Sequence, residues 1–309
     1  MATLDQLAQQ GDPGTLRTEQ QAGELRLMNP QQLYELWERQ HWSAHEIDLS
    51  RDAEDFERLS PEAREHAIWT MASFFIGEER VTTQFSGLVM SYEDESEASY
   101  LATQQVDEAR HMQFFDRFYR EVVAIEGADF EARLARVREE LNDAFTRLFD
   151  DALVEAGRRL VADPRDLEAK VDFVTTYHMV IEGTLALTGQ YFLTDWLESA
   201  DLMPGFREGF GLIAQDEHRH VAYGTWYLQQ SADRDPALAE RMRARLHELL
   251  PVAAGVLVPV GMDPAEDWEL LGYTSTEING FAFRSLSRRL KAIGVPLVAE
   301  EAAAVGTPA

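Results

Sequence analysis

A five-residue pattern of charged residues occurs twice in this sequence, as Asp107-Glu108-Ala109-Arg110-His111 and as Asp216-Glu217-His218-Arg219-His220. Residues three apart in a helix lie on one face about a turn from each other, so each copy would direct a glutamate carboxylate and a histidine imidazole to the same place. A carboxylate and an imidazole held together in this way are a pair of metal ligands.

Both predicted ligand pairs lie on helical faces that are otherwise apolar. A carboxylate in an apolar core is costly unless it is paired, protonated or bound to a metal, and a cation is the partner that suits a glutamate–histidine face best. We therefore expect both pairs to face the core and to bind metal there. The apolar residues on the first face are Leu101, Met112, Phe115, Phe118 and Val122, and those on the second are Phe210, Ile213, Val221 and Leu228.

Two single glutamates would complete the ligand shell. Glu78 and Glu182 each lie on an apolar stripe of a predicted helix, and each precedes one of the Glu-x-x-His pairs along the chain. The two pairs are 109 residues apart (217 minus 108) and the two glutamates are 104 apart (182 minus 78), which indicates two related helix pairs. Glu79 has a more polar face than its neighbour Glu78, so we expect Glu79 to be exposed rather than a ligand.

Two aspartates are predicted to support the histidine ligands. Asp107 and Asp216 directly precede the paired glutamates and lie about 100° round their helices from them. From there each could accept the second N–H of a histidine on the opposite helix, a contact that orients a metal-bound imidazole. His178 has no acidic residue at ligand spacing and is predicted to be a packing residue.

The composition restricts the classes of function. A formal net charge of -27 over 309 residues argues against a nucleic-acid partner and against an anionic membrane surface. The absence of cysteine excludes disulfides, a thiol nucleophile and an iron–sulfur cluster. Residues 1–11 lack the pattern of a secretory signal, and the longest apolar run, Leu249–Met262, is too short to span a bilayer. We therefore expect a cytoplasmic protein with no transmembrane segment.

The six ligands must be positioned by long helices that pack together, so we expect one domain over residues 26–295. Residues 1–25 and 296–309 are predicted to be flexible. Ser60-Pro61-Glu62 is typical of a helix start, with a hydroxyl cap, a proline at the first position and an acid in the first turn. No strand pattern is convincing, which makes the fold class all-α. The amphipathic segment 130–160 is predicted to supply packing or a partner surface without a role in the chemistry, and further helices are predicted over 236–250 and 275–293.

Four glutamates and two histidines in this order resemble the dinuclear ligand set of ferritin-like four-helix bundles. We therefore predict a ferritin-like four-helix bundle core with additional helices. Ligands without thiolate suit iron or manganese, and a dinuclear site of this kind suits oxygen chemistry. Glu108 and Glu217 are the predicted bridges between the ions, and Glu78 and Glu182 are the predicted terminal ligands.

At these residues the chain resembles the small, metal-bearing subunit of ribonucleotide reductase and its relatives. Trp42 and the stretch Glu46-Ile47-Asp48-Leu49-Ser50-Arg51-Asp52 are similar to the N-terminal segment of that family. The resemblance implies a hydrogen-bonded chain formed by Trp42, Asp216 and His111.

Within that superfamily the sequence is more similar to the ligand-binding oxidases that hold a manganese/iron pair. The similar stretches are Gly77-Glu78-Glu79-x-Val81-Thr82, Tyr177 through Gly189, and Pro204 through Thr225. The resemblance implies an ether bond between Tyr177 and Val81 made when O2 is reduced, a long-chain fatty acid or similar lipid at the site, and a homodimer. It also implies manganese bound by Glu78, Glu108 and His111 and iron bound by Glu182, Glu217 and His220, with Fe/Fe as the alternative pair.

These observations predict an O2-activating dinuclear oxidase, with a radical-generating small subunit of ribonucleotide reductase as the main alternative. Two departures count against the alternative. Phe115 stands four residues after His111, where many such subunits carry a radical tyrosine, and no tyrosine follows Tyr273. A ferritin-like iron store and a helical scaffold without metal are further alternatives.

Overall fold

The computed structural model describes residues 27–125, 127, 129–263 and 265–297. The predicted flexible segment 1–25 lies outside these residues, as does the chain from residue 298 onward. The described elements are almost all helices, which confirms the all-α prediction. Among them, no helix is both long and apolar enough to cross a membrane.

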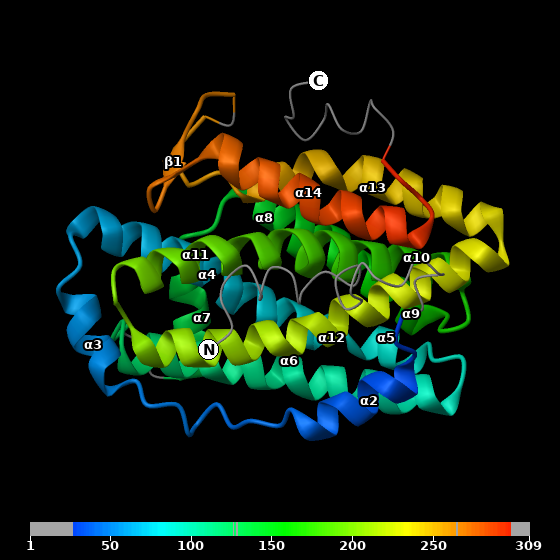
Figure 1. The fold of residues 1–309 in the computed structure, drawn as a ribbon, viewed down its shortest axis with the longest axis horizontal. Helices are drawn as coiled ribbons and strands as arrows, with labels where there is room; N and C mark the ends of the chain where they lie inside the picture. Colours follow the sequence, from blue (N-terminus) through cyan, green and yellow to red (C-terminus); the bar gives the residue numbers. More distant parts are fainter. Residues whose placement is uncertain (1–26, 126, 128, 264, 298–309) are drawn as a thin grey trace, which may run out of the picture.

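Four long helical segments form the core of the fold and run side by side along the molecule (Figure 1). The third of them changes from α-helix to π-helix and back along its length. The segments are α4 (Pro61–Gln84), α6 (Glu95–Glu121), the run of α10 (Leu167–Val174), η2 (Thr175–Ala186) and α11 (Leu187–Ser199), and α12 (Pro204–Arg234).

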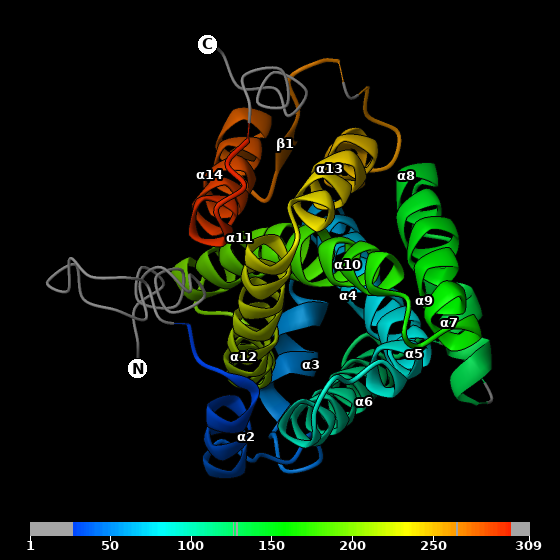
Figure 2. The same ribbon diagram turned by 90° about the vertical axis from the view of Figure 1, so that its right-hand side faces the viewer.

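The remaining elements surround this core, with α13 and α14 on one side of it and α2 on the opposite side (Figure 2). The unpredicted strands β1 and β2 form a hairpin of two residues per strand, too short to leave an alternating pattern in the sequence. Helix α13 continues through Pro251, beyond its predicted end at residue 250. The bounds are α2 (Pro30–Arg39), α3 (Ser50–Glu57), α5 (Ser86–Met90), α7 (Phe130–Arg138), α8 (Asp143–Phe145), η1 (Thr146–Leu153), α9 (Val154–Ala162), α13 (Pro236–Val256), β1 (Glu269–Leu270), β2 (Tyr273–Thr274) and α14 (Ser275–Ile293).

Side-chain caps explain where the ligand-bearing helices begin. Ser60 Oγ accepts a hydrogen bond from the Ala63 amide at 3.1 Å, as expected for the start of α4. This hydrogen bond satisfies a backbone amide that has no partner within the helix. The third core segment begins after its cap Asp166, whose side chain accepts a hydrogen bond from the Ala169 amide, and Pro164 lies in the preceding turn.

The start of α12 is fixed by the short helix α3. The Asp52 carboxylate accepts hydrogen bonds from the amides of Gly205 at 2.9 Å and Phe206 at 2.6 Å, at the positive end of the α12 dipole. A Cβ at Gly205 would lie 2.1 Å from the Asp48 carbonyl oxygen, so only glycine allows this close approach. The contact ties the segment before α4 to the helix that carries Glu217 and His220.

The π-helical stretch η2 contains both Tyr177 and Glu182. Within it, Thr184 Oγ1 donates to the Met179 carbonyl, and a Cβ added at Gly183 would lie 2.6 Å from the His178 carbonyl oxygen. Such π-helical turns occur frequently at functional sites, because the extra residue in the turn changes where side chains point.

Candidate metal centre

The structure brings the six predicted ligands together in the middle of the bundle. They form two groups of four residues, and within each group the possible ligand atoms all lie within 4.8 Å of one another. Glu108 and Glu217 belong to both groups, as expected of residues that bridge two ions. The first group is Glu78, Glu108, His111 and Glu217, and the second is Glu108, Glu182, Glu217 and His220.

In the first group, the Nδ1 atom of His111 faces the carboxylates. It lies 3.5 Å from Glu78 Oε2, 3.6 Å from Glu108 Oε2 and 3.6 Å from Glu217 Oε1. The His111 ring is fully buried, and its Nδ1 has no hydrogen-bond partner among the described residues. A buried nitrogen surrounded by carboxylate oxygens is a position that a cation would fill.

The second group is built in the same way around His220. Its Nδ1 lies 3.0 Å from Glu108 Oε1, 3.0 Å from Glu182 Oε1 and 3.6 Å from Glu217 Oε2. Glu182 Oε2 and Glu217 Oε2 are buried and have no hydrogen-bond partner among the described residues. The donor set is oxygen and nitrogen without sulfur, which suits iron and manganese.

The pKa values of these groups reflect the cost of burying charge. Burial raises the pKa of Glu78 to about 8 and that of Glu182 well above its usual value. Burial alone would lower the pKa of His111 and His220, but the neighbouring carboxylates outweigh it and raise both values. Without metal, these groups therefore retain protons to near or above neutral pH in place of a cation.

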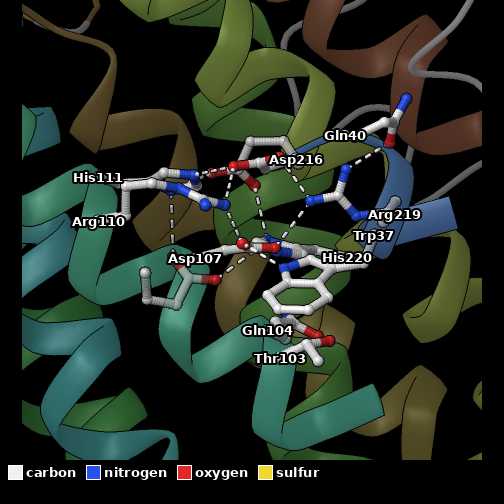
Figure 3. Close-up of polar contacts among 12 residues, drawn as sticks. Trp37, Gln40, Thr103, Gln104, Asp107, Arg110, His111, Asp216, Arg219 and His220 are labelled. Atoms are coloured by element: carbon white, nitrogen blue, oxygen red, sulfur yellow. Dashed lines mark hydrogen bonds and ion pairs between the residues drawn. The ribbon is translucent and has the colours of Figure 1, made fainter. Parts of the chain in front are cut away.

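Behind the first histidine, Asp216 is the centre of a buried network (Figure 3). His111 Nε2 lies 3.2 Å from Asp216 Oδ2, Trp42 Nε1 donates to the same oxygen at 2.7 Å, and Arg110 Nη2 donates to it at 2.9 Å. Burial alone would raise the pKa of Asp216, but the His111 hydrogen bond and the charges of His111, Arg219 and Arg110 together lower it well below its usual value. Asp216 is therefore a carboxylate that orients His111.

Asp107 occupies the matching position behind the second histidine (Figure 3). His220 Nε2 lies 3.2 Å from Asp107 Oδ2, Trp37 Nε1 donates to Oδ1 at 2.8 Å, and Arg219 Nη2 donates to Oδ2 at 2.8 Å. Each aspartate thus contacts the histidine of the opposite helix, and each accepts a hydrogen bond from its own tryptophan.

Three members of this network were not among the predicted site residues: Trp37, Arg110 and Arg219. Each arginine contacts both aspartates, because Arg110 also donates to Asp107 and Arg219 donates to Asp216 Oδ1 at 2.5 Å. The sequence contains a signal for the arginines, which stand fourth in both five-residue patterns, three residues after the aspartate. Trp37 has no such signal, since α2 approaches α6 only in the folded protein.

An apolar cavity extends from the ligand cluster towards the surface. Its volume is about 900 Å³ when the space open to solvent is included, and Glu78, Glu108, Glu182 and Glu217 line it. Its walls include Val81 on α4 and Tyr177 on η2. Phe145 and Phe149 also line it, so the segment 130–160, predicted to have no role in the chemistry, contributes a wall of the site.

Tyr177 is tied directly to a predicted ligand. Its hydroxyl donates to the Glu108 carboxylate and accepts a hydrogen bond from Gln104 Nε2 at 3.1 Å. Burial raises the pKa of Tyr177 well above its usual value, so the phenol stays protonated and can donate its hydrogen bond to Glu108. His178 is buried beside it, 3.2 Å from Gln104 Nε2, and belongs to neither ligand group.

Glu79 is directed away from the cluster. It forms an ion pair with Arg80 at 2.8 Å and lies 3.9 Å from Arg138. Its side chain is 16% exposed, so the prediction of an exposed residue is wrong, although Glu79 belongs to neither ligand group. Of these two contacts, only the one with Arg138 reaches another helix, α7.

Comparisons with known proteins agree with this geometry. The family model of the ribonucleotide reductase small chain matches residues 28–298. A solved R2-like ligand-binding oxidase, in a glycine-to-phenylalanine variant with an anaerobically reconstituted Mn/Fe cofactor, is 28% identical with a TM-score of 0.74, covering 87% of this chain and 94% of the other. A valine-to-isoleucine variant with an aerobically reconstituted Mn/Fe cofactor has a TM-score of 0.75 at 28% identity, covering 86% of this chain and 94% of the other.

Fold and site together define a helical-bundle protein with a buried carboxylate–histidine cluster able to bind two metal ions. The chain belongs to the ribonucleotide reductase small-chain family. At this coarse level it is an oxidoreductase, and the Mn/Fe cofactor of its structural neighbours agrees with the predicted metals.

Proposed function

We propose that the chain is a dinuclear Mn/Fe or Fe/Fe oxidase that activates O2, joins Tyr177 to Val81 by an ether bond and binds a long-chain fatty-acid-like ligand. The observation that carries the proposal is that one apolar cavity is lined by the glutamate ligands, by Tyr177 and by Val81. Manganese would be held by Glu78, Glu108 and His111, and iron by Glu182, Glu217 and His220.

When bound, the metal pair would supply two of the four electrons that reduce O2 to water. Formation of the ether bond supplies the other two, because it removes one hydrogen atom from the Tyr177 hydroxyl and one from the Val81 side chain. The Tyr177 proton has an acceptor in place, since the hydroxyl donates to Glu108. Gln104 holds the phenol oxygen at 3.1 Å and limits its rotation.

The same cavity suits a ligand with one acidic end and a long apolar body. Its charged lining residues are the four glutamates, where a carboxylate head would meet the cations, and apart from Thr70, Ser73 and Thr188 most of the remaining wall is aromatic or aliphatic. This distribution favours a long-chain carboxylic acid over a polar substrate. A homodimer is proposed from the resemblance to the oxidases.

A second candidate is a radical-generating small subunit of ribonucleotide reductase, which the family match favours. The Trp42–Asp216–His111 contacts also suit it. Against it, the position four residues after His111 holds Phe115, which packs between Phe74 and Phe210 at ring distances of 5.9 and 6.0 Å and has no hydroxyl to oxidise. Stable co-purification with a large reductase subunit would favour this candidate.

The test is mass spectrometry of protein loaded anaerobically with iron(II) and manganese(II), before and after exposure to air. We expect the loss of two hydrogen atoms, mapped to a peptide pair that joins Tyr177 to Val81. Tyr177→Phe should abolish the link, whereas Tyr223→Phe, which removes a buried hydroxyl bound to Glu97 instead of Glu108, should leave it intact. Two bound ions without a link after air would refute the self-modifying oxidase and favour the reductase subunit.

A further inference from the structure

The turn that joins β1 to β2 contains a bulky residue in an unusual conformation. Leu270 pairs with Tyr273, so the loop is only Leu271 and Gly272, with φ angles of 55° and 86°. A two-residue hairpin loop with both φ angles positive favours Asn-Gly or Gly-Gly. Gly272 suits this turn, but a leucine with positive φ is a steric outlier that needs compensation elsewhere.

The compensation lies in what the Leu271 side chain contacts. Leu271 lines the cavity described above and packs against both hydrophobic clusters of the fold. Leu270 lines the same cavity and is buried with Trp69 and Ile278 in the smaller cluster. The hairpin therefore presents two successive leucines to the cavity.

These leucines line the cavity in the cluster that also contains Trp69. Trp69, which packs in the same cluster as Leu270, precedes Glu78 by nine residues on α4, which is about 14 Å along the helix axis. A ligand that reaches from the glutamates to the hairpin must therefore be a long chain, and its end would meet the apolar side chains of Leu270 and Leu271.

We propose that Leu271 is the end stop of this cavity and sets the length of the acyl chain that the protein accepts. The inference rests on the proposed function, because it assumes a carboxylic acid whose head lies at the metal cluster. Each methylene buried along the wall should raise affinity about four-fold, until the chain end meets Leu271. The protein should then show a sharp optimum in chain length.

The experiment uses metal-loaded, air-free protein and straight-chain saturated acids from decanoate to docosanoate, with binding measured by calorimetry. Leu271→Gly removes the side chain and suits the positive φ, so the hairpin should remain folded. We expect this variant to move the optimum to longer acids by a few methylenes and Leu271→Phe to move it to shorter ones. Val260→Ala, at a 56% exposed position that does not line the cavity, is the control and should not move it.

The outcomes separate the inference from the proposed function. Wild-type protein that binds two ions but no acid of any length overturns the fatty-acid part of the proposed function and the end stop with it. A wild-type optimum that neither Leu271 variant moves overturns the end stop alone. A shift in opposite directions for glycine and phenylalanine supports it.

Discussion

Because Asp216 supports His111 and Asp107 supports His220, the two metal positions should respond separately to mutation. Asp216→Asn keeps the size of the side chain but removes the charge that holds the His111 ring, 3.2 Å away. We expect the ion bound through His111 to be held about 10- to 100-fold more weakly, the usual range for losing such a partner. This corresponds to about 1.4 to 2.7 kcal/mol of binding free energy. Asp107→Asn should cause the same loss at the other ion.

The assay is an anaerobic titration with manganese(II) in the presence of a competing chelator, from which two binding constants are obtained. Each variant should weaken one constant, and the two variants should not weaken the same one. Asp116→Asn is a matched control, because Asp116 is also a buried carboxylate on α6 but pairs with Arg133 at 2.7 Å. If both site variants weaken both ions equally, the arginines that contact both aspartates couple the network into one unit, and the reasoning is refuted.

Two further predictions concern the ligands themselves. Glu108→Ala removes a residue shared by both groups and should abolish binding of the metal pair, so two ions per chain by elemental analysis would contradict the ligand assignment. In the metal-free protein, stability should fall as pH rises from about 5 to 9. Folding raises the pKa of Glu78 from 4.5 to about 8 and also raises those of His111 and His220, so the folded state binds more protons than the unfolded state. For each extra proton that the folded state binds, the free energy of unfolding falls by about 1.4 kcal/mol per unit rise in pH. Thermal melts in chelator at pH 6 and 8.5 measure this, and a metal-free protein that is more stable at pH 8.5 would contradict it.

The ligand cluster could be predicted from the sequence because each ligand pair is local. Glu108 and His111 are three residues apart on one helix, so helical geometry alone places them together. The choice of Glu78 over Glu79 followed from the apolar stripe around Glu78, and only Glu78 belongs to a ligand group. The apolar periodicity of the sequence is therefore sufficient to identify the helical faces that meet in the core.

The rest of the site depends on approaches between segments far apart in the chain. Trp37 meets Asp107 across 70 residues, and the strands around Leu271 are too short for their pairing to leave a pattern. The π-helical geometry around Tyr177 depends on tertiary packing, because a π turn has no residue preference strong enough to read from one sequence. Phe149 reaches the cavity from a segment whose pattern indicated only packing.

The arrangement of charge in the cluster suits two cations. The network behind the histidines is balanced by itself, since Asp107 and Asp216 carry two negative charges and Arg110 and Arg219 carry two positive ones. The four glutamate ligands carry four negative charges in a buried space when ionised, and the two histidines are neutral when they bind metal through Nδ1. Two divalent ions balance this charge and one does not, because a single ion would leave two buried glutamates to take up protons. The raised pKa values of Glu78 and Glu182 are therefore the expected property of a site built for a pair of ions.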